Sequence, residues 1–275
     1  MGSIGILLLA TGHQNYYRMA VNLAASIKRH NAQVDISCVI DASPFPIAFS
    51  PLIDKHFRIP SMLPGDLKTR IYELSPYDRT LYLDVDMIML PDRDITELFT
   101  ELDGVPFTVM NTCAGDDYSV WVDATAIRSA TQNVDDPLPA YYSELMYFEK
   151  CEYTASYFEK VRYEYVTSEL RGKQFAGGMA DELAFILASM KGRIFPHKLN
   201  WLPIFWHFRD RKDTGLQPYQ LAKKYYGYSL GGNRTPPHVK AQYDNLVSYY
   251  AQVMKVTKPY KAVDKRMYLS NRSKI

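Results

Sequence analysis

The chain carries two aspartates, one residue apart, inside an otherwise apolar stretch. Asp84 and Asp86 flank Val85, with Leu-Tyr-Leu before them and Met-Ile-Met-Leu after them. Carboxylates in such surroundings are costly to remove from water unless an opposite charge compensates them. A divalent cation can do so, and Mg²⁺ or Mn²⁺ prefers oxygen ligands while keeping coordination positions open for phosphate. The triplet therefore predicts a metal site that acts on a phosphate or diphosphate group.

A polar loop follows the first apolar run of the chain, residues 4–10. The loop reads Thr-Gly-His-Gln-Asn over residues 11–15 and is rich in residues that favour turns. Residues 17–30 then place apolar side chains at helical spacing, and residues 34–40 return to a strand pattern. A strand-helix-strand unit favours a parallel sheet, which binds ligands at the carboxyl ends of its strands. The loop is therefore expected to lie at a ligand site.

The remainder of the chain continues to alternate between strand and helix patterns. A proline-rich stretch, residues 44–64, is expected to be irregular. Helices are predicted for residues 67–74 and 180–190, and strands for residues 79–90, 144–149 and 193–196. This alternation predicts one α/β domain with a mainly parallel central sheet flanked by helices.

Composition and cysteine content limit the class of protein. With 275 residues, of which 47% are hydrophobic, the chain is long enough for an ordinary globular core. Its three cysteines are odd in number and lack metal-ligand spacing, which favours a reducing compartment over a disulfide framework. The apolar run at residues 4–10 is too short to span a membrane and has no basic residue before it. We therefore expect a cytoplasmic protein.

The charge of the chain is uneven, although its formal net charge is only +2. Residues 255–275 contain seven Lys or Arg and one acid, Asp264, together with Tyr260 and Tyr268. A basic, aromatic end can lie against an anionic membrane surface, which would make the protein peripheral to the membrane, or against a nucleic-acid backbone. It can equally be a solvated face of the protein.

Two blocks of residues resemble a known group of enzymes. Ala10, Thr11 and Tyr16 begin the first block, and Lys68 lies sixteen residues before Asp84 in the second. These blocks resemble the nucleotide-sugar transferases with the single-domain, Rossmann-like glycosyltransferase A fold. The resemblance is strongest to glycosyltransferase family 8, which includes glycogenin and bacterial lipooligosaccharide galactosyltransferases. It implies that Thr11 and Tyr16 contact the base and ribose of the donor and that Lys68 contacts its diphosphate or sugar.

A third block resembles the acceptor side of the same family. Residues 141–148 and 177–184 are similar to the family's acceptor-side strand and to the start of its aspartate-containing helix. The resemblance implies that Asp181, and with it Glu182, contacts the donor sugar, although an aspartate here can also be a helix N-cap. Where the family reads Asn-Ser-Gly, this chain reads Tyr-Ser-Glu, ending at Glu144. Family members retain the anomeric configuration, whereas an inverting enzyme would need a base such as Glu144, Asp181 or Glu182.

A histidine completes the metal site in many members of the family. The resemblance implies His238 as this third ligand, and His207 is the competing candidate. Imidazole is an acceptable ligand for Mn²⁺ beside two carboxylates.

The resemblance extends with gaps over residues 4–240. We therefore expect residues 1–240 to form the catalytic domain and residues 241–275 to form a basic, aromatic, helical extension. One departure lies in the first loop, where the family often has an aspartate at the position of Gln14.

Together these residues predict a metal-dependent glycosyltransferase. It would use Mn²⁺ or Mg²⁺ and a nucleoside-diphosphate sugar, first of all a UDP-sugar, and transfer the sugar to a hydroxyl group. The expected acceptor is a glycan, a lipid-linked sugar or a hydroxylated base in DNA, as in bacteriophages that glycosylate their genomes. A sugar-phosphate nucleotidyltransferase is an alternative, although those enzymes commonly have a glycine-rich, basic first loop, whereas residues 11–16 contain one glycine and no Lys or Arg. A non-catalytic nucleotide-binding module is a second alternative to the glycosyltransferase.

Overall fold

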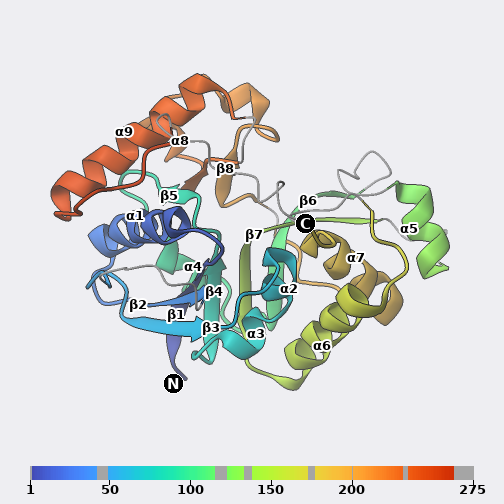
Figure 1. Cartoon of the computed structure of the whole chain (residues 1–275). Coiled ribbons are helices and arrows are strands. Elements are labelled where there is room, and N and C mark those ends of the chain that lie inside the picture. Colours follow the sequence, from blue (N-terminus) through green and yellow to red (C-terminus); the bar gives the residue numbers. More distant parts are fainter. Residues whose placement is uncertain are drawn as a thin grey trace. The chain divides into compact units, whose positions relative to one another are not determined.

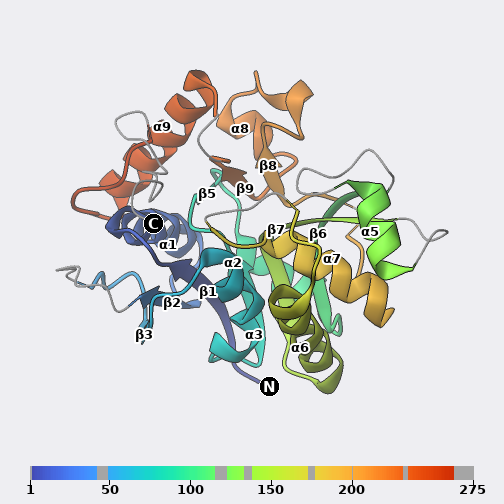
Figure 2. The same cartoon turned by 45° about the vertical axis from the view of Figure 1, so that its right-hand side comes forward.

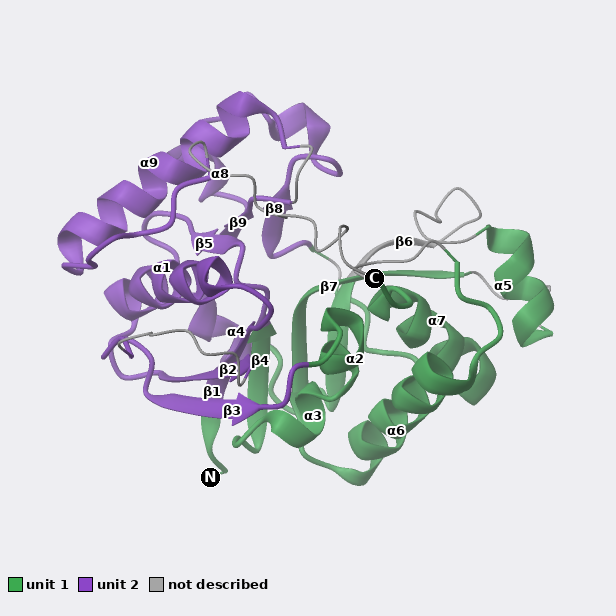
Figure 3. Ribbon diagram, viewed as in Figure 1, with its two compact units in different colours: residues 1–4, 62–82, 102–201 green, residues 5–61, 83–101, 202–275 purple. Residues whose placement is uncertain are grey.

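The computed structural model describes residues 2–41, 49–114, 123–132, 138–172, 177–199, 201–231 and 235–262 of the chain. Its fold is mixed α/β, with a mostly parallel central sheet flanked by helices (Figure 1), which confirms the expected fold class. The chain divides into two compact units, each assembled from segments that are far apart in the sequence (Figure 3). Unit 1 comprises residues 1–4, 62–82 and 102–201, and unit 2 comprises residues 5–61, 83–101 and 202–275.

Unit 2 begins with the strand-helix-strand segment predicted from the sequence. Strands β1 (Ile4–Ala10), β2 (Asp35–Asp41) and β3 (Lys55–Ile59) are parallel and lie in the order β3-β2-β1, and helix α1 (Gln14–His30) connects β1 to β2. The apolar runs of β1 and β2 are almost completely buried, as expected for strands covered on both faces. The side chain of His13 accepts a hydrogen bond from the backbone of Asn15 and so caps the start of α1.

A second, three-stranded sheet in unit 2 follows the two aspartates. Strand β5 (Met87–Met89) pairs antiparallel with β9 (Gly227–Ser229), which pairs parallel with β8 (Ile204–Trp206). The predicted strand at residues 79–90 is therefore two strands, because β4 (Arg79–Leu83) belongs to the larger sheet and the chain changes sheet at the aspartates.

Helix α9 (Pro237–Val253) lies alongside α1 in both views (Figures 1 and 2). It runs through the boundary predicted between residues 240 and 241 and ends well before residue 262, and the division into two domains stays a prediction. The short elements of unit 2 are η1 (Ile95–Glu97), α4 (Leu98–Glu101), η2 (Arg211–Asp213) and α8 (Pro218–Leu221).

Unit 1 is built on strands β4, β7 (Pro139–Glu149) and β6 (Phe107–Ala114), in the order β4-β7-β6, with β6 and β7 antiparallel. Its helices are α2 (Pro64–Thr69), α3 (Ile71–Leu74), α5 (Ala124–Thr131), α6 (Glu152–Thr167) and α7 (Asp181–Gly192). Helix α6 packs against α7. Aromatic rings fill this packing, with Phe158 edge-on to both Phe107 and Phe185, a geometry that aromatic pairs favour.

Several local predictions from the sequence are wrong. Residues 193–196 form no strand, and the neighbouring His197 makes only an isolated bridge to Thr108. A strand, β3, lies within the stretch expected to be irregular. Asp181 is the first residue of α7 and not its N-cap, which is Ala180 and has no side-chain hydrogen bond. In the ranges described above, no helix is both long and apolar enough to cross a membrane.

Ser26 connects α1 to β5, the strand that follows the aspartates, and its replacement by alanine should destabilise the protein. Its fully buried hydroxyl donates to Leu23 O (2.7 Å) and accepts from Met89 N (3.1 Å). Because Ser26→Ala leaves a buried N–H without this partner, we expect the free energy of unfolding to fall by about 1–3 kcal/mol, measured by urea unfolding. The exposed Ser129→Ala is the control and should change it by less than about 0.5 kcal/mol. Equal stability of the two variants would contradict this role.

Candidate functional site

The two aspartates lie in the turn between β4 and β5, where the backbone of unit 2 holds them in place. Asp84 and Asp86 are half-buried and flank the buried Val85. The carbonyl of Asp86 accepts a hydrogen bond from Leu230 N (3.0 Å), directly after β9. The main chain of Asp86 is therefore held in place by the small sheet.

Tyr16, in the first turn of α1, lies within electrostatic reach of both aspartates. Burial raises the pKa of its phenol above the usual range, and the charges of Asp86 and Asp84 add to the effect, as does Tyr260. The phenol therefore stays protonated and can donate a hydrogen bond. The structure thus brings together three of the residues predicted from the sequence. Two others begin the adjoining loop, Ala10 buried at the end of β1 and Thr11 half-buried after it.

Asp41, at the carboxyl end of β2, is a candidate site residue that the sequence prediction did not include. Its side chain is 4% exposed, and Oδ2 accepts a hydrogen bond from Gly12 N (2.9 Å) in the first loop. Gly12 has φ +87°, in the left-handed region that favours glycine. Oδ1 is buried and makes no hydrogen bond within the described ranges, which is costly for a carboxylate. An acid ending the second apolar strand was the available signal, since an acidic residue after this strand contacts ribose in Rossmann dinucleotide-binding folds.

His207 directly follows β8 and has both ring nitrogens buried. Neither nitrogen makes a hydrogen bond within the described part of the chain, and the residue is 4% exposed. Burial lowers its pKa to about 4, and the nearby His238 contributes to the lowering. His207 is therefore a neutral imidazole at physiological pH, which is the form that binds metals.

The register of the small sheet relates His207 to Asp86. Trp206 pairs with Ser229, and Ser229 pairs with Met87, so the next row along the strands contains His207, Leu230 and Asp86. The main chains of His207 and Asp86 are thus two strand spacings apart, roughly 10 Å. His238, in the first turn of α9, is exposed. In the described part of the chain, no three His, Cys, Asp or Glu side chains are grouped closely enough to hold a metal ion as they stand. The buried, unbonded nitrogens of His207 nevertheless fit a role as a ligand.

Unit 1 contains a separate, charged network around Lys68. Lys68 Nζ donates to Ser143 Oγ (3.0 Å), Ser143 Oγ donates to Glu182 Oε1 (3.2 Å), and Asp181 Oδ2 lies 3.7 Å from the same ammonium. The side chains of Lys68 and Asp181 are only 16% and 5% exposed, so the network is largely shielded from water. The ammonium also lies 5.8 Å from the centre of the Tyr82 ring. The structure thus brings together Lys68, Asp181 and Glu182 from the predicted set.

A bulge in β7 places Ser143 in this network. Val109 of β6 pairs with Met146 of β7, but the next residue of β6, Met110, pairs with Tyr142. Residues 143–145 of β7 therefore lie outside the regular ladder. Bulges redirect side chains and are frequent beside active sites. Glu144, the third predicted base, is half-buried in the same bulge. The sequence marked this segment only as a departure from the family pattern.

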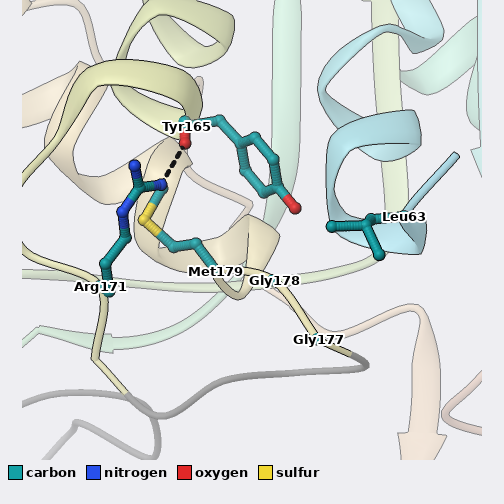
Figure 4. Close-up of a pocket in the computed structure, with 6 residues that line it drawn as sticks. All are labelled: Leu63, Tyr165, Arg171, Gly177, Gly178 and Met179. Carbon is teal, nitrogen blue, oxygen red and sulfur yellow. Dashed lines mark hydrogen bonds between the residues drawn. The ribbon is translucent and has the colours of Figure 1, made fainter. Parts of the chain in front are cut away.

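A hollow of about 260 Å³ lies on the elements that carry this network (Figure 4). It is lined by Leu63, Tyr165, Arg171, Gly177, Gly178 and Met179. Leu63 directly precedes α2, which carries Lys68, and Met179 lies two residues before Asp181. Arg171 donates to Tyr165 O (2.7 Å) and Val166 O (2.9 Å), so its guanidinium stabilises the last turn of α6.

No protein-family model matches the sequence, and no curated protein matches it. Among solved structures, the chain is similar to the apo form of mouse xyloside xylosyltransferase 1, with a TM-score of 0.50 and 14% sequence identity over 85% of this chain and 99% of that chain. It is also similar to the apo structure of the bifunctional glycosyltransferase WbbM, with a TM-score of 0.56 and 13% identity. That match covers 91% of this chain, which spans about half (51%) of WbbM. At these identities the likeness establishes the fold, which is the glycosyltransferase A fold expected from the sequence.

Proposed function

We propose that the protein is a metal-dependent glycosyltransferase that uses a nucleoside-diphosphate sugar. The observation that carries this proposal is the gathering of Tyr16, Asp84 and Asp86 in unit 2 of a chain with the glycosyltransferase A fold. The gathering combines acidic metal ligands with an aromatic, hydrogen-bonding side chain, which are the groups that a nucleotide diphosphate requires. A UDP-sugar is the first donor to test.

The nucleoside end of the donor is assigned to the first loop and β2. Thr11 and Tyr16 are proposed to contact the base and ribose, beside the backbone of Ala10. Asp41 adds a buried acceptor, because Oδ1 can accept a hydrogen bond from a ribose hydroxyl or a base N–H. This carboxylate takes the place of the aspartate that the family often has at the position of Gln14.

Asp84, Asp86 and His207 are the residues proposed to hold Mn²⁺ or Mg²⁺. Two carboxylates and a neutral imidazole suit Mn²⁺, and buried nitrogens favour His207 over the exposed His238. When bound, the metal would neutralise charge on the diphosphate leaving group. Val85 keeps the two carboxylates apart and packs its own side chain into the core.

The sugar is assigned to the Lys68 network of unit 1. Its ammonium can donate to an oxygen of the donor, while Asp181 and Glu182 can accept hydrogen bonds from sugar hydroxyls. We propose a retaining transfer, as in the family that the sequence resembles. An inverting transfer would instead require Glu144, Asp181 or Glu182 to take the proton of the acceptor hydroxyl. We propose that the hollow beside Tyr165 binds the acceptor, which is a glycan or a lipid-linked sugar, through one of its sugar hydroxyl groups.

Removal of either carboxylate should abolish most activity. We expect Asp84→Asn and Asp86→Asn to lower the Mn²⁺-dependent hydrolysis of UDP-sugars by about 100-fold, measured by release of UDP. Chelation of divalent ions should have the same effect on the wild-type protein. The control is Asp35→Asn, which removes a carboxylate from an exposed ion pair with Lys55 and should leave the rate unchanged. Full hydrolysis by both variants, or in the presence of a chelator, would refute metal-dependent transfer.

Replacement of the two histidines should separate their roles. His207→Ala is expected to weaken Mn²⁺ binding by about tenfold, because it removes a buried nitrogen, whereas His238→Ala should weaken it by less than about threefold. Binding is measured by electron paramagnetic resonance of free Mn²⁺. The opposite order would assign the third ligand to His238.

Asp41→Asn should weaken nucleotide binding without unfolding the protein. The amide can still accept from Gly12 N, but it loses the charged acceptor, so we expect the Kd for UDP with Mn²⁺ to rise about tenfold in calorimetry. Comparison of UDP with 2′-deoxy-UDP identifies whether ribose is the partner. Asp54→Asn is the control, because Asp54 Oδ2 accepts from Ile36 N (2.8 Å) near the start of β2. An unchanged Kd in Asp41→Asn would exclude Asp41 from the nucleotide site.

A further inference from the structure

Ser143, in the bulge of β7, makes hydrogen bonds to two charged side chains. The residue is 0% exposed, and its Oγ accepts from Lys68 Nζ (3.0 Å) and donates to Glu182 Oε1 (3.2 Å). A hydroxyl group has a single proton, so Oγ is an acceptor toward the cation and a donor toward the carboxylate. Hydrogen bonds to charged groups are stronger than those between neutral groups. Ser143 thus connects an ammonium on α2 to a carboxylate on α7.

The Lys68 ammonium lies closer to Ser143 than to the carboxylate of Asp181. Asp181 Oδ2 is 3.7 Å from Nζ, which is too far for a hydrogen bond. Oδ2 is buried and accepts no hydrogen bond within the described ranges, and the Asp181 side chain is only 5% exposed. The network therefore contains a carboxylate oxygen that is shielded from water and still able to accept a hydrogen bond.

A direct ion pair between Lys68 and Asp181 would use up this acceptor. Opposite charges so close together attract each other strongly where water is largely excluded. A lysine side chain is flexible and its ammonium turns easily toward a new partner. The hydrogen bond to Ser143 opposes this movement, because it holds Nζ in its present place.

We propose that Ser143 is a positioning residue of the sugar site, which keeps Lys68 from closing on Asp181 and so leaves that carboxylate available to the donor sugar. The same hydroxyl fixes Glu182 through its second hydrogen bond. A neutral sugar hydroxyl suits such a site, since it can donate to a carboxylate and accept from an ammonium at once. The inference rests on the proposed function and deepens it. Groups held in their binding geometry in advance leave less ordering to the reaction.

A serine that merely filled the core would behave differently. Its replacement would lower the melting temperature but leave the kinetic constants of the folded enzyme unchanged. A positioning role affects the sugar part of the donor and spares the nucleotide part, which is assigned to unit 2. The test therefore reads the kcat/KM for hydrolysis of a nucleotide sugar and the inhibition constant, Ki, of the free nucleoside diphosphate.

The full chain is first assayed with MnCl₂ against UDP-glucose, UDP-galactose, UDP-xylose, GDP-mannose and dTDP-glucose, and the fastest substrate is used throughout. We expect Ser143→Ala to lower kcat/KM for its hydrolysis about 20-fold, because two charged groups lose a hydrogen-bond partner. The Ki of the matching nucleoside diphosphate should stay within about twofold of its wild-type value.

Two further variants separate the hydrogen bonds from packing and stability. Ser143→Cys keeps a side chain of similar shape but hydrogen-bonds weakly, and should lower kcat/KM about tenfold. Ser189→Ala is the matched control, because it also removes a fully buried serine hydroxyl of unit 1. The partners of Ser189 Oγ are the phenols of Tyr141 and Tyr157, both at 2.9 Å. This control should lower the melting temperature and leave kcat/KM within about twofold.

The outcomes separate this inference from the function on which it rests. If the full chain hydrolyses none of the five nucleotide sugars, the proposed function fails and the inference fails with it. If the full chain is active, but folded Ser143→Ala and Ser143→Cys are equally active, the inference alone is overturned. An equal loss in Ser189→Ala, or an equal rise in Ki, would also overturn it. Should Ser143→Ala not fold, Ser143→Cys and the control decide the question.

Discussion

The position of the Asp86 main chain is the constraint on which unit 2 depends. Its carbonyl is bound by Leu230 N after β9, and the strand that follows it is bound to α1 through Ser26. The charge of its side chain then acts on Tyr16 and Tyr243 from two different helices. A carboxylate kept half-buried in this way needs donors or a cation nearby.

Both clusters of charged residues contain buried polar atoms that make no hydrogen bond within the described ranges. In unit 1, hydrogen bonds join Lys68, Ser143 and Glu182, whereas Asp181 Oδ2 lies 3.7 Å from the Lys68 ammonium and accepts no hydrogen bond there. In unit 2, the same is true of Asp41 Oδ1 and the nitrogens of His207. Buried atoms of this kind indicate a place for a ligand, because proteins rarely leave them unpaired without a reason.

The first part of the basic C-terminal end, residues 258–262, is packed against the rest of unit 2. Charge and aromatic content alone suit a membrane surface or a nucleic acid, and both remain predictions for the residues beyond 262. Up to Ala262, however, the backbone is held by Arg18, Asn22 and Asp244. The backbone that carries the lysines of this segment is therefore held in place, and Tyr260 is buried.

The sequence by itself determined the alternation of elements and the chemistry of the aspartate pair. Periodicity placed β1 to the residue and β2 within one residue, while α1 begins three residues before the predicted stretch. The resemblance selected Lys68, Asp181 and Glu182, which the structure groups together. Only the tertiary structure decided that residues 79–90 enter two sheets and that buried atoms of Asp41 and His207 make no hydrogen bond to any described residue. It also decided that Ser143 joins the Lys68 network and that Tyr260 is buried. The physical reason is that periodicity reports how one segment divides its faces between core and water. The partner of a buried charge comes from a distant segment, as Ser143 does for Lys68, and is known only when the fold brings the two together.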